Sequence, residues 1–375
     1  MRGAAGDGCP YRDRQLIRRA IVRLGTMAAT LVTHPEDRQR SHLPRLRTGL
    51  MAFGFLVLAF VVAASAYQWL AHTWDLHHNP PPGRSVDVGG YRMHINCIGH
   101  GTPTVILDSG LSDSSLSWYK VQPQVARFAT VCSYDRAGLG WSDSSPKPRT
   151  GGVFAEELHS LLINAKVSSP FILVGHSMGG LDVRIYAGRY RSELAGVVLV
   201  DSTHPDLADR LPVLKAGLAD WERQLKHQEY LMPFGIPRLL VWCVSGPPEI
   251  RAEMRTVECT VSRLRETVAE CESTWNESAT AARKVTTLGD LPLVVLSEDP
   301  AKNVPEYLSV FEAGQQELAR LSSNSTRVVA YGSGHQIQKE RPDLVVAAVQ
   351  RVVDESRRHE LSARPLLSKP GDSVN

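Results

Sequence analysis

Residues 171–180 read FILVGHSMGG, an apolar run that ends abruptly in a glycine-rich turn. The run predicts a buried strand, and the residues after the turn are able to form a helix. Gly175, Ser177 and Gly179 follow the G-x-S-x-G pattern, which places a serine on a tight turn between a strand and a helix. Glycines two positions before and after the serine leave room for neighbouring backbone. The pattern predicts that Ser177 is a nucleophile at the carboxyl edge of a sheet.

A histidine loop near the end of the chain supplies a candidate base. A serine hydroxyl becomes a strong nucleophile only when a base takes its proton and a carboxylate orients that base. His335 fits this role, because it ends the motif GSGH after the last strand-like run. His176 lies inside the turn and is expected to point away from the site. His204 is expected to lie where a helical insertion begins.

Three carboxylates satisfy the chain order of serine, acid and histidine. Asp201 closes the run at residues 197–200, while Glu298 and Asp299 follow the run that ends at Leu296. Asp201 and Asp299 are the leading candidates for the triad acid. The one that does not serve is expected to be a turn or capping carboxylate, which is the ordinary role of aspartate at the start of a loop.

Two backbone N–H groups are expected to form an oxyanion hole. One belongs to Met178, at the start of the helix after the serine, where the helix dipole also favours negative charge. The other belongs to Leu111, in the loop DSGLS after the run at residues 104–107. A second turn reads YDRAGLGWS, and its Asp135 and Arg136 are expected to form a structural ion pair.

Short runs rich in Val, Ile and Leu recur between helical stretches. They lie at residues 104–107, 129–134, 171–174, 196–200, 291–296 and 326–330, after two runs at 85–88 and 92–97 that flank a Gly-Gly turn. A hairpin followed by alternating strands and helices predicts an α/β fold, with a mostly parallel sheet covered by helices on both faces. Residues 203–285 are too long for a plain crossover and show helical periodicity, which predicts a cap above Ser177 that excludes water.

The beginning of the chain predicts attachment to a membrane. Residues 1–48 hold ten arginines and four acidic residues, so the net charge of this basic segment is about +6. The whole chain has a net charge of +3, and the remainder is therefore negative. The overall balance therefore indicates no nucleic-acid partner. Residues 49–70 (GLMAFGFLVLAFVVAASAYQWL) are uncharged and long enough to cross a hydrocarbon core of about 30 Å.

The arginines also predict an orientation. By the positive-inside rule, the N-terminus is expected in the cytoplasm and the catalytic domain on the other side, with Tyr67, Trp69 and Trp74 at the far interface. A signal peptide cleaved after the A-S-A at residues 64–66, which would give a secreted enzyme, is one alternative. A helix of a soluble core is another. A linker is expected over residues 71–84.

The six cysteines are too few for a disulfide scaffold. Cys97 and Cys132 lie in apolar runs and are expected to be buried thiols. Cys243, Cys259 and Cys271 share one helical region, where one pair is expected to be oxidised if the domain lies outside the cytoplasm.

From about residue 85 to residue 358 the chain resembles an α/β-hydrolase. The segments that carry the resemblance are, in order, DSGLSDSSLSW, YDRAGLGWSD, GHSMGG, VVLVDSTHP and GSGH. It implies an eight-stranded core made of residues 85–202 and 286–358, with a helical cap after the sixth strand. A disordered tail is expected over residues 359–375.

The resemblance also implies a Ser-His-acid triad on Ser177, His335 and either Asp201 or Asp299, with no cofactor and no metal. The chain departs from the family in two places. The usual His-Gly of the oxyanion loop is Ser109-Gly110 here, and the loop after the 291–296 run is shorter than the common form, which counts against Asp299.

The sequence therefore predicts a serine hydrolase that cleaves a small-molecule ester through an acyl-enzyme intermediate. It contains no sign of an oligomeric state. A serine nucleophile argues against dehalogenase and epoxide hydrolase chemistry, which in this fold uses an aspartate. Two alternatives stay open: a cofactor-free haloperoxidase or perhydrolase with the same triad, and a non-catalytic ligand-binding relative.

Overall fold

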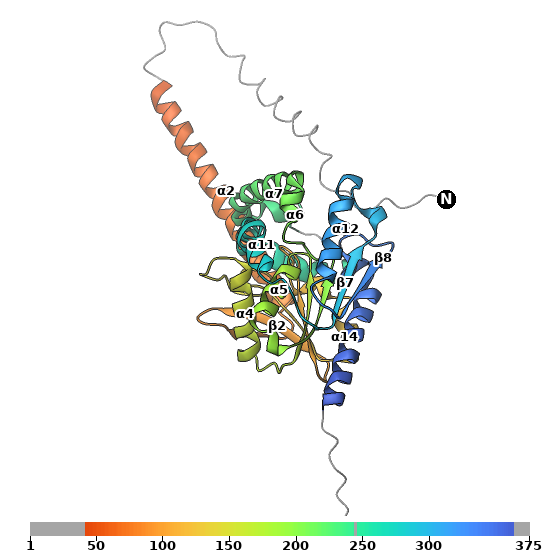
Figure 1. Ribbon diagram of the computed structural model, residues 1–375. Coiled ribbons are helices and arrows are strands. Elements are labelled where there is room, and N and C mark those ends of the chain that lie inside the picture. The colour runs from red at the N-terminus through yellow and green to blue at the C-terminus, as the bar shows by residue number, and fades with distance from the viewer. Residues whose placement is uncertain (1–41, 244–245, 364–375) are drawn as a thin grey trace, which may run out of the picture. The chain divides into compact units, whose positions relative to one another are not determined.

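The computed structural model describes residues 42–243 and 246–363 (Figure 1). Most of the basic segment predicted for residues 1–48, and most of the tail predicted for 359–375, lie outside these described residues. The chain divides into two compact units, one ending at Val61 and the other beginning at Val62. The second unit contains the sheet and every predicted site residue.

An eight-stranded sheet organises this second unit. Its spatial order is β1-β2-β4-β3-β5-β6-β7-β8, with β1–β2 and β2–β4 antiparallel and the other neighbouring pairs parallel. The predicted α/β class with a mostly parallel sheet is confirmed. The strands are β1 Arg84–Asp87, β2 Arg92–Ile98, β3 Thr104–Asp108, β4 Val131–Tyr134, β5 Phe171–His176, β6 Leu194–Val200, β7 Leu293–Glu298 and β8 Ser325–Ala330.

Helices cover both faces, because the central strands β3 and β5 are buried at every position and both sides need an apolar partner. Leu158 of α4 and Tyr186 of α5 pack on one face, and Val125 of α3 and Val349 of α14 on the other. Figure 1 shows α4 and α5 on one side of the sheet and α14 on the opposite side. Besides α2, which is described below, the described helices outside the segment between β6 and β7 are α3 Gln122–Val125, α4 Gly151–Asn164, α5 Gly179–Arg189, α12 Pro305–Ala319, α13 Ile337–Glu340 and α14 Pro342–Ala363, with 3₁₀ turns η1 Ser115–Trp118, η2 Arg191–Glu193 and η6 Pro300–Lys302.

The segment between β6 and β7 is helical, and we call residues 203–285 the helical insertion. Leu225, Met232, Leu264 and Val268 give it a small apolar core of its own. Its elements are α6 Leu207–Arg210, α7 Pro212–Leu231, η3 Met232–Phe234, α8 Ile236–Leu239, η4 Pro248–Ile250, α9 Arg251–Glu258, α10 Val261–Ser273, the π-helical turn η5 Thr274–Ser278 and α11 Ala279–Arg283.

Two disulfides are present among the described residues. Cys97 and Cys132 are register partners on β2 and β4, with their Cα atoms 4.0 Å apart, and they are bonded to each other. The prediction of buried thiols at these positions was wrong, because the pairing of two strands is not readable from either run alone. The second disulfide joins Cys243 to Cys259 inside the helical insertion, and Cys271 remains a buried thiol.

Helix α2, His42–His78, is the one described helix long and apolar enough to cross a membrane. Its most apolar window has a mean hydropathy of 2.3 and no buried residue. The helix runs well into the predicted linker at residues 71–84. Its last turns are held by tertiary contacts, since Asp75 forms ion pairs with Arg238 and Arg255 of the helical insertion. At the other end of the chain, α14 continues to Ala363, inside the predicted tail.

Candidate active site

Ser177 occupies the sharp turn between β5 and α5. Its φ of 52° lies in the left-handed region, which is uncommon for a residue with a side chain and marks local strain. A Cβ atom at Gly175 would lie 2.5 Å from the carbonyl oxygen of Gly179, and one at Gly179 would lie 2.6 Å from that of Ser109. Backbone therefore approaches so closely on both sides of the serine that only glycine fits.

The structure brings Ser177, His335 and Asp201 together at the carboxyl ends of β5, β8 and β6. The His335 Nε2 atom lies 3.0 Å from Ser177 Oγ, and its Nδ1 atom lies 2.6 Å from Asp201 Oδ2. Because the carboxylate accepts, Nδ1 carries the proton and Nε2 is left to accept from the serine hydroxyl. This is the arrangement in which an imidazole can act as the base for a serine.

The two candidate acids occupy different environments. Asp201 is 3% exposed, and its second oxygen accepts a hydrogen bond from the N–H of Glu298 at 2.9 Å. Asp299 instead accepts from the N–H groups of Gly332 and Ala301, at 2.8 and 2.9 Å. These bonds lower the pKa of Asp299 and make it a turn-capping carboxylate. Only Asp201 is hydrogen-bonded to the imidazole.

Neighbouring charges shift the titration of the site. Partial burial lowers the pKa of His335, but the hydrogen bond that its ring donates to Asp201 and the charge of Asp201 raise it more, so that the net shift is upward from the ordinary histidine value. Burial raises the pKa of Glu298 to about 7, and the charge of Asp201 adds to this rise. Glu298 therefore gains and loses its proton near neutral pH, and it lies directly beside Asp201.

The two predicted oxyanion donors lie at the same cavity. Leu111 and Met178 both line a cavity of about 370 Å³ that also contains Ser177 and His335. A Cβ atom added to Gly110 would lie 3.3 Å from the Cβ of Ser177, so the loop after β3 lies directly against the serine. Met178 is the N-cap residue of α5, where the helix dipole favours an anion.

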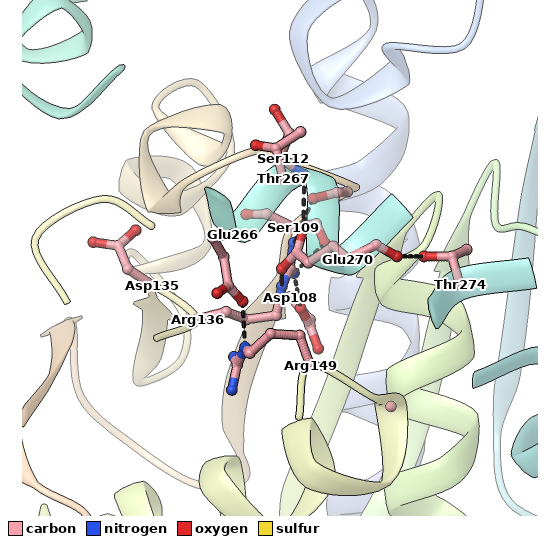
Figure 2. Close-up of polar contacts among 12 residues, drawn as sticks. Asp108, Ser109, Ser112, Asp135, Arg136, Arg149, Glu266, Thr267, Glu270 and Thr274 are labelled. Carbon is pink, nitrogen blue, oxygen red and sulfur yellow. Dashed lines mark hydrogen bonds and ion pairs between the residues drawn. The ribbon is translucent and has the colours of Figure 1, made fainter. Parts of the chain in front are cut away.

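A buried arginine, Arg136, contacts the loop after β3 (Figure 2). Arg136 donates hydrogen bonds to the carbonyl oxygens of Ser109 and Gly110, at 2.7 and 2.6 Å. It also pairs with Asp108 at 3.0 Å and with Glu270 at 2.5 Å, and all three side chains are at most 2% exposed. Bonds to two successive carbonyl groups fix the orientation of the peptide planes that lead to the Leu111 N–H.

The same network joins this loop to the helical insertion. The carboxylate of Glu270, on α10, accepts two hydrogen bonds from Arg136 and a third from the N–H of Ser112, at 2.9 Å. The sequence predicted an ion pair between Asp135 and Arg136, and that prediction was wrong: Asp135 instead contacts His94 Nδ1 at 2.8 Å. The partners of Arg136 come from other elements, and Glu270 is 134 residues away in the sequence.

Loss of the Arg136 side chain is expected to cost about 3 to 5 kcal/mol of stability, because Asp108 and Glu270 would remain buried without their cation. Arg136→Met, which keeps much of the volume, should therefore lower the melting temperature strongly. The matched control is Arg189→Met, since Arg189 forms an exposed ion pair with Glu156 that is worth about 1 kcal/mol or less. Equal melting temperatures for the two variants would contradict this account of the network.

The prediction that His176 points away from the site was wrong, because its side chain lines the cavity and contacts the loop of His335. His176 donates from Nε2 to the carbonyl oxygen of His335 at 3.0 Å, and its Nδ1 lies 3.2 Å from Gln338 Nε2. The carbonyl can only accept, so Nε2 carries the proton. Burial lowers the pKa of His176 and keeps the ring neutral. The residue thus ties the histidine loop to the serine turn, over 159 positions of sequence that carry no signal of the contact.

The walls of the cavity are largely apolar. Leu214 and Leu218 of α7, with Trp275 of the π-helical turn, contribute from the helical insertion, and Phe311 contributes from α12. Beyond the triad geometry, the acidic groups in the lining are Asp113 and Glu298. No lysine or arginine lines the cavity within the part of the chain that the structure describes.

One group of side chains in the described ranges could gather three metal ligands. Ligand atoms of His204, Asp206 and Glu317 lie within 4.8 Å of one another. Arg210 pairs with both carboxylates, and Arg283 pairs with Asp206. The guanidinium groups already neutralise these acids, so we interpret the group as an ion-pair cluster where the helical insertion meets α12.

Comparison with known proteins agrees with the fold. Residues 103–228 match the sequence profile described as the alpha/beta hydrolase fold. The chain is 24% identical to a probable transporter, efuK, of Hormonema carpetanum, over 80% of this chain and 46% of that protein. It is 23% identical to an AB hydrolase superfamily protein of Gibberella zeae, over 67% of this chain and 86% of that protein. The chain spans less than half of the length of the curated relatives that it matches first.

Solved structures show the same architecture. A thermophilic esterase from Thermogutta terrifontis superposes with a TM-score of 0.54 at 22% identity, covering 73% of this chain and 98% of the esterase. A bromoperoxidase from Bacillus anthracis superposes with a TM-score of 0.54 at 19% identity, covering 72% and 99%. With its sheet order, its strand–serine–helix turn and the profile match, the chain has the alpha/beta hydrolase fold.

Proposed function

We propose that this protein is a serine hydrolase that cleaves uncharged esters of small molecules. The observation that carries the proposal is the unbroken hydrogen-bonded chain from Ser177 through His335 to Asp201, at a cavity that Leu111 and Met178 also line. The similarity to an esterase fold supports hydrolysis as the reaction class. This constellation supplies a nucleophile, a base, a carboxylate that orients the base, and oxyanion donors.

The reaction follows from the positions of these groups. Ser177 Oγ attacks the ester carbonyl carbon as its proton passes to His335 Nε2, and the carbonyl electrons move onto the oxygen. The N–H groups of Leu111 and Met178 stabilise that oxyanion. The imidazolium, held by Asp201, then protonates the departing alcohol and leaves an acyl-enzyme. A water molecule activated by the same imidazole cleaves the acyl-enzyme and restores the serine.

The lining of the cavity defines the class of substrate. Apolar walls favour apolar acyl or alcohol groups. Glu298 disfavours an anionic group, because no lysine or arginine lines the cavity among the described residues, whereas Asp113 is paired with Lys339 at 3.8 Å. A panel of p-nitrophenyl esters tests this. Neutral acyl groups should be preferred over a carboxylate-bearing acyl group of equal length by at least about tenfold in kcat/KM, which corresponds to about 1.4 kcal/mol. No hydrolysis of any ester by the folded protein would contradict the proposed function.

The pH dependence of such hydrolysis has a definite sign. His335 must be neutral to accept the serine proton, and its pKa is raised above the ordinary value. Activity should therefore fall on the acid side, with a midpoint above about 6.5, the pKa of a free histidine. The measurement is kcat/KM from about pH 5 to pH 9. A midpoint clearly below that value would contradict the assigned role of Asp201.

A second reaction class is favoured by one comparison. A cofactor-free perhydrolase would use the same triad, and the fold superposes on a bromoperoxidase. In that reaction hydrogen peroxide, in place of water, attacks the acyl-enzyme and yields a peracid that oxidises halide. Peroxide-dependent bromination in acetate buffer, absent from Ser177→Ala, would favour this class over simple ester hydrolysis.

We further propose that α2 anchors the protein in a membrane with the catalytic domain outside the cytoplasm. The apolar window of α2, the arginines before it, and the disulfides Cys97–Cys132 and Cys243–Cys259 support this orientation. A C-terminal alkaline phosphatase fusion should be active, and cytoplasmic access to the C-terminus would overturn the orientation. A mature N-terminus at Tyr67 would instead indicate a cleaved signal peptide.

A further inference from the structure

Four consecutive apolar side chains are exposed on the helical insertion. Leu239, Leu240, Val241 and Trp242 are 62%, 52%, 61% and 53% exposed, respectively. They begin at the last residue of α8 and end directly before Cys243 of the Cys243–Cys259 disulfide. Isolated exposed apolar residues are ordinary, whereas a contiguous run of large ones marks an interaction surface.

This run lies beside the last turns of α2. Val241 shares a shallow depression with Tyr67, Ala71 and Trp74, and the ion-paired side chains of Asp75, Arg238 and Arg255 also line it. Gly235, which precedes α8, is so close to Tyr67 that an added Cβ atom would lie 2.8 Å from its ring. The neighbouring Trp69, Leu70 and Trp74 of α2 are also more than half exposed. We call the two sets the interfacial surface: Tyr67, Trp69, Leu70, Trp74, Leu239, Leu240, Val241 and Trp242.

Buried polar contacts fix the two sets relative to each other. Asp75, which is 2% exposed, pairs with Arg238 and, at 2.7 Å, with Arg255. Gln68 donates to the carbonyl oxygen of Cys259 at 2.9 Å and accepts from Arg238 at 3.2 Å. Breaking such contacts would leave buried charges without partners, so the surface is held as one piece. All of these residues belong to the unit that begins at Val62.

We propose that the interfacial surface inserts into a lipid bilayer, at the boundary between headgroups and acyl chains. In the sequence, Tyr67, Trp69 and Leu70 of this surface close the uncharged stretch at residues 49–70. Helix α2 has no polar face, which matches lipid rather than a one-sided protein groove. Its eight members carry no charge and include three tryptophans and a tyrosine, the side chains enriched at that depth of a membrane.

Membrane contact by the helical insertion has a consequence for the cavity. α7 lines the cavity with Leu214 and Leu218, and it is followed by η3 and α8, which lead into residues 239–242. Insertion of residues 239–242 into the bilayer would therefore also restrict the movement of the adjoining end of α7.

The inference rests on α2 as a membrane segment. It does not depend on ester hydrolysis, so its test uses no activity measurement.

The experiment places an environment-sensitive label on the full chain in lipid nanodiscs. Cys9, outside the described residues, is first changed to serine, and Leu240→Cys then carries an NBD fluorophore. The matched control is Ile163→Cys on α4, which is similarly exposed at 58%. The Cys9→Ser chain without an added cysteine measures background labelling of the buried Cys271. Thermal melts confirm that each variant is folded.

Label at position 240 should show blue-shifted emission and several-fold quenching by lipids with a nitroxide near the headgroup. Quenching should be weaker for a nitroxide at the end of the acyl chain, and absent for the label at position 163. The proposal would be overturned if the label at position 240 emitted at the same wavelength as the label at position 163 and was likewise not quenched by the nitroxide lipids. Blue-shifted emission without lipid quenching would overturn it too, and would assign the surface to a protein partner or, if nitroxide-labelled chain quenches it, to a second copy.

Discussion

Ser177→Ala is expected to lower kcat for ester hydrolysis by about 10⁴-fold or more, because the substitution removes the only atom that can form the acyl-enzyme. Activity that remains would come from the oxyanion donors and from substrate binding. KM should change little, since the Ser177 hydroxyl contributes little to binding the ground state. The measurement is steady-state kinetics on the best ester of the panel, with purified protein in detergent or nanodiscs.

The control for this variant separates chemistry from folding. Alanine keeps the Cβ atom and the left-handed backbone at position 177, so the melting temperature should match that of the wild type to within a few degrees. Ser160→Ala, which removes a hydroxyl that bonds within α4, should leave kcat unchanged. A Ser177→Ala protein that folds and keeps more than a tenth of wild-type kcat would rule out the proposed nucleophile.

Asp201→Asn is expected to reduce kcat by about 10⁴-fold as well, for a different reason. The asparagine amide would donate to His335 Nδ1 and hold the proton on Nε2, the atom that must accept from Ser177. Asp299→Asn should keep kcat within about threefold of wild type, since Asp299 binds only the N–H groups of Gly332 and Ala301 and stabilises their turn. The two variants remove the same charge, so their comparison isolates the position of the carboxylate.

One outcome would contradict the assignment of Asp201 and point to Glu298 instead. If both aspartate variants keep more than about a tenth of wild-type kcat, a difference worth about 1.4 kcal/mol, neither residue is the triad acid. Glu298→Gln would then be the next variant to test, since Glu298 lines the cavity beside Asp201. Thermal melts of each variant exclude loss of activity through unfolding.

Local patterns of the sequence were enough to predict the fold class. The strand runs, the glycine pattern around Ser177 and the GSGH loop each express a constraint between residues that are near in sequence. Alternation of strands and helices predicts a mostly parallel sheet, but the strand order is seen only in the structure. The local patterns also singled out Ser177 and His335, whose side chains lie 3.0 Å apart in the structure. The sequence could not decide between Asp201 and Asp299, because both follow strand ends. The tertiary structure shows that Asp201 contacts the imidazole of His335, whereas Asp299 accepts from two backbone N–H groups.

The features that sequence reasoning missed all depend on distant residues. Cys97 and Cys132 meet through strand register, and Arg136 finds Glu270 across 134 positions. The helix α2 extends into a segment that composition marks as a linker, because Asp75 is paired with Arg238, 163 residues away. Such contacts leave no periodicity or motif in either segment, so only the folded chain reveals them.

The most direct measurement is the site of covalent modification by a fluorophosphonate probe on the wild-type protein. The account predicts one adduct, mapped by peptide mass spectrometry to Ser177, formed quickly in the wild type and not in Ser177→Ala. Labelling should be strongly slowed in Asp201→Asn and almost unchanged in Asp299→Asn. A folded wild-type protein that takes no probe, or that carries it on a residue other than Ser177, would contradict the claim that this cavity is a serine hydrolase site.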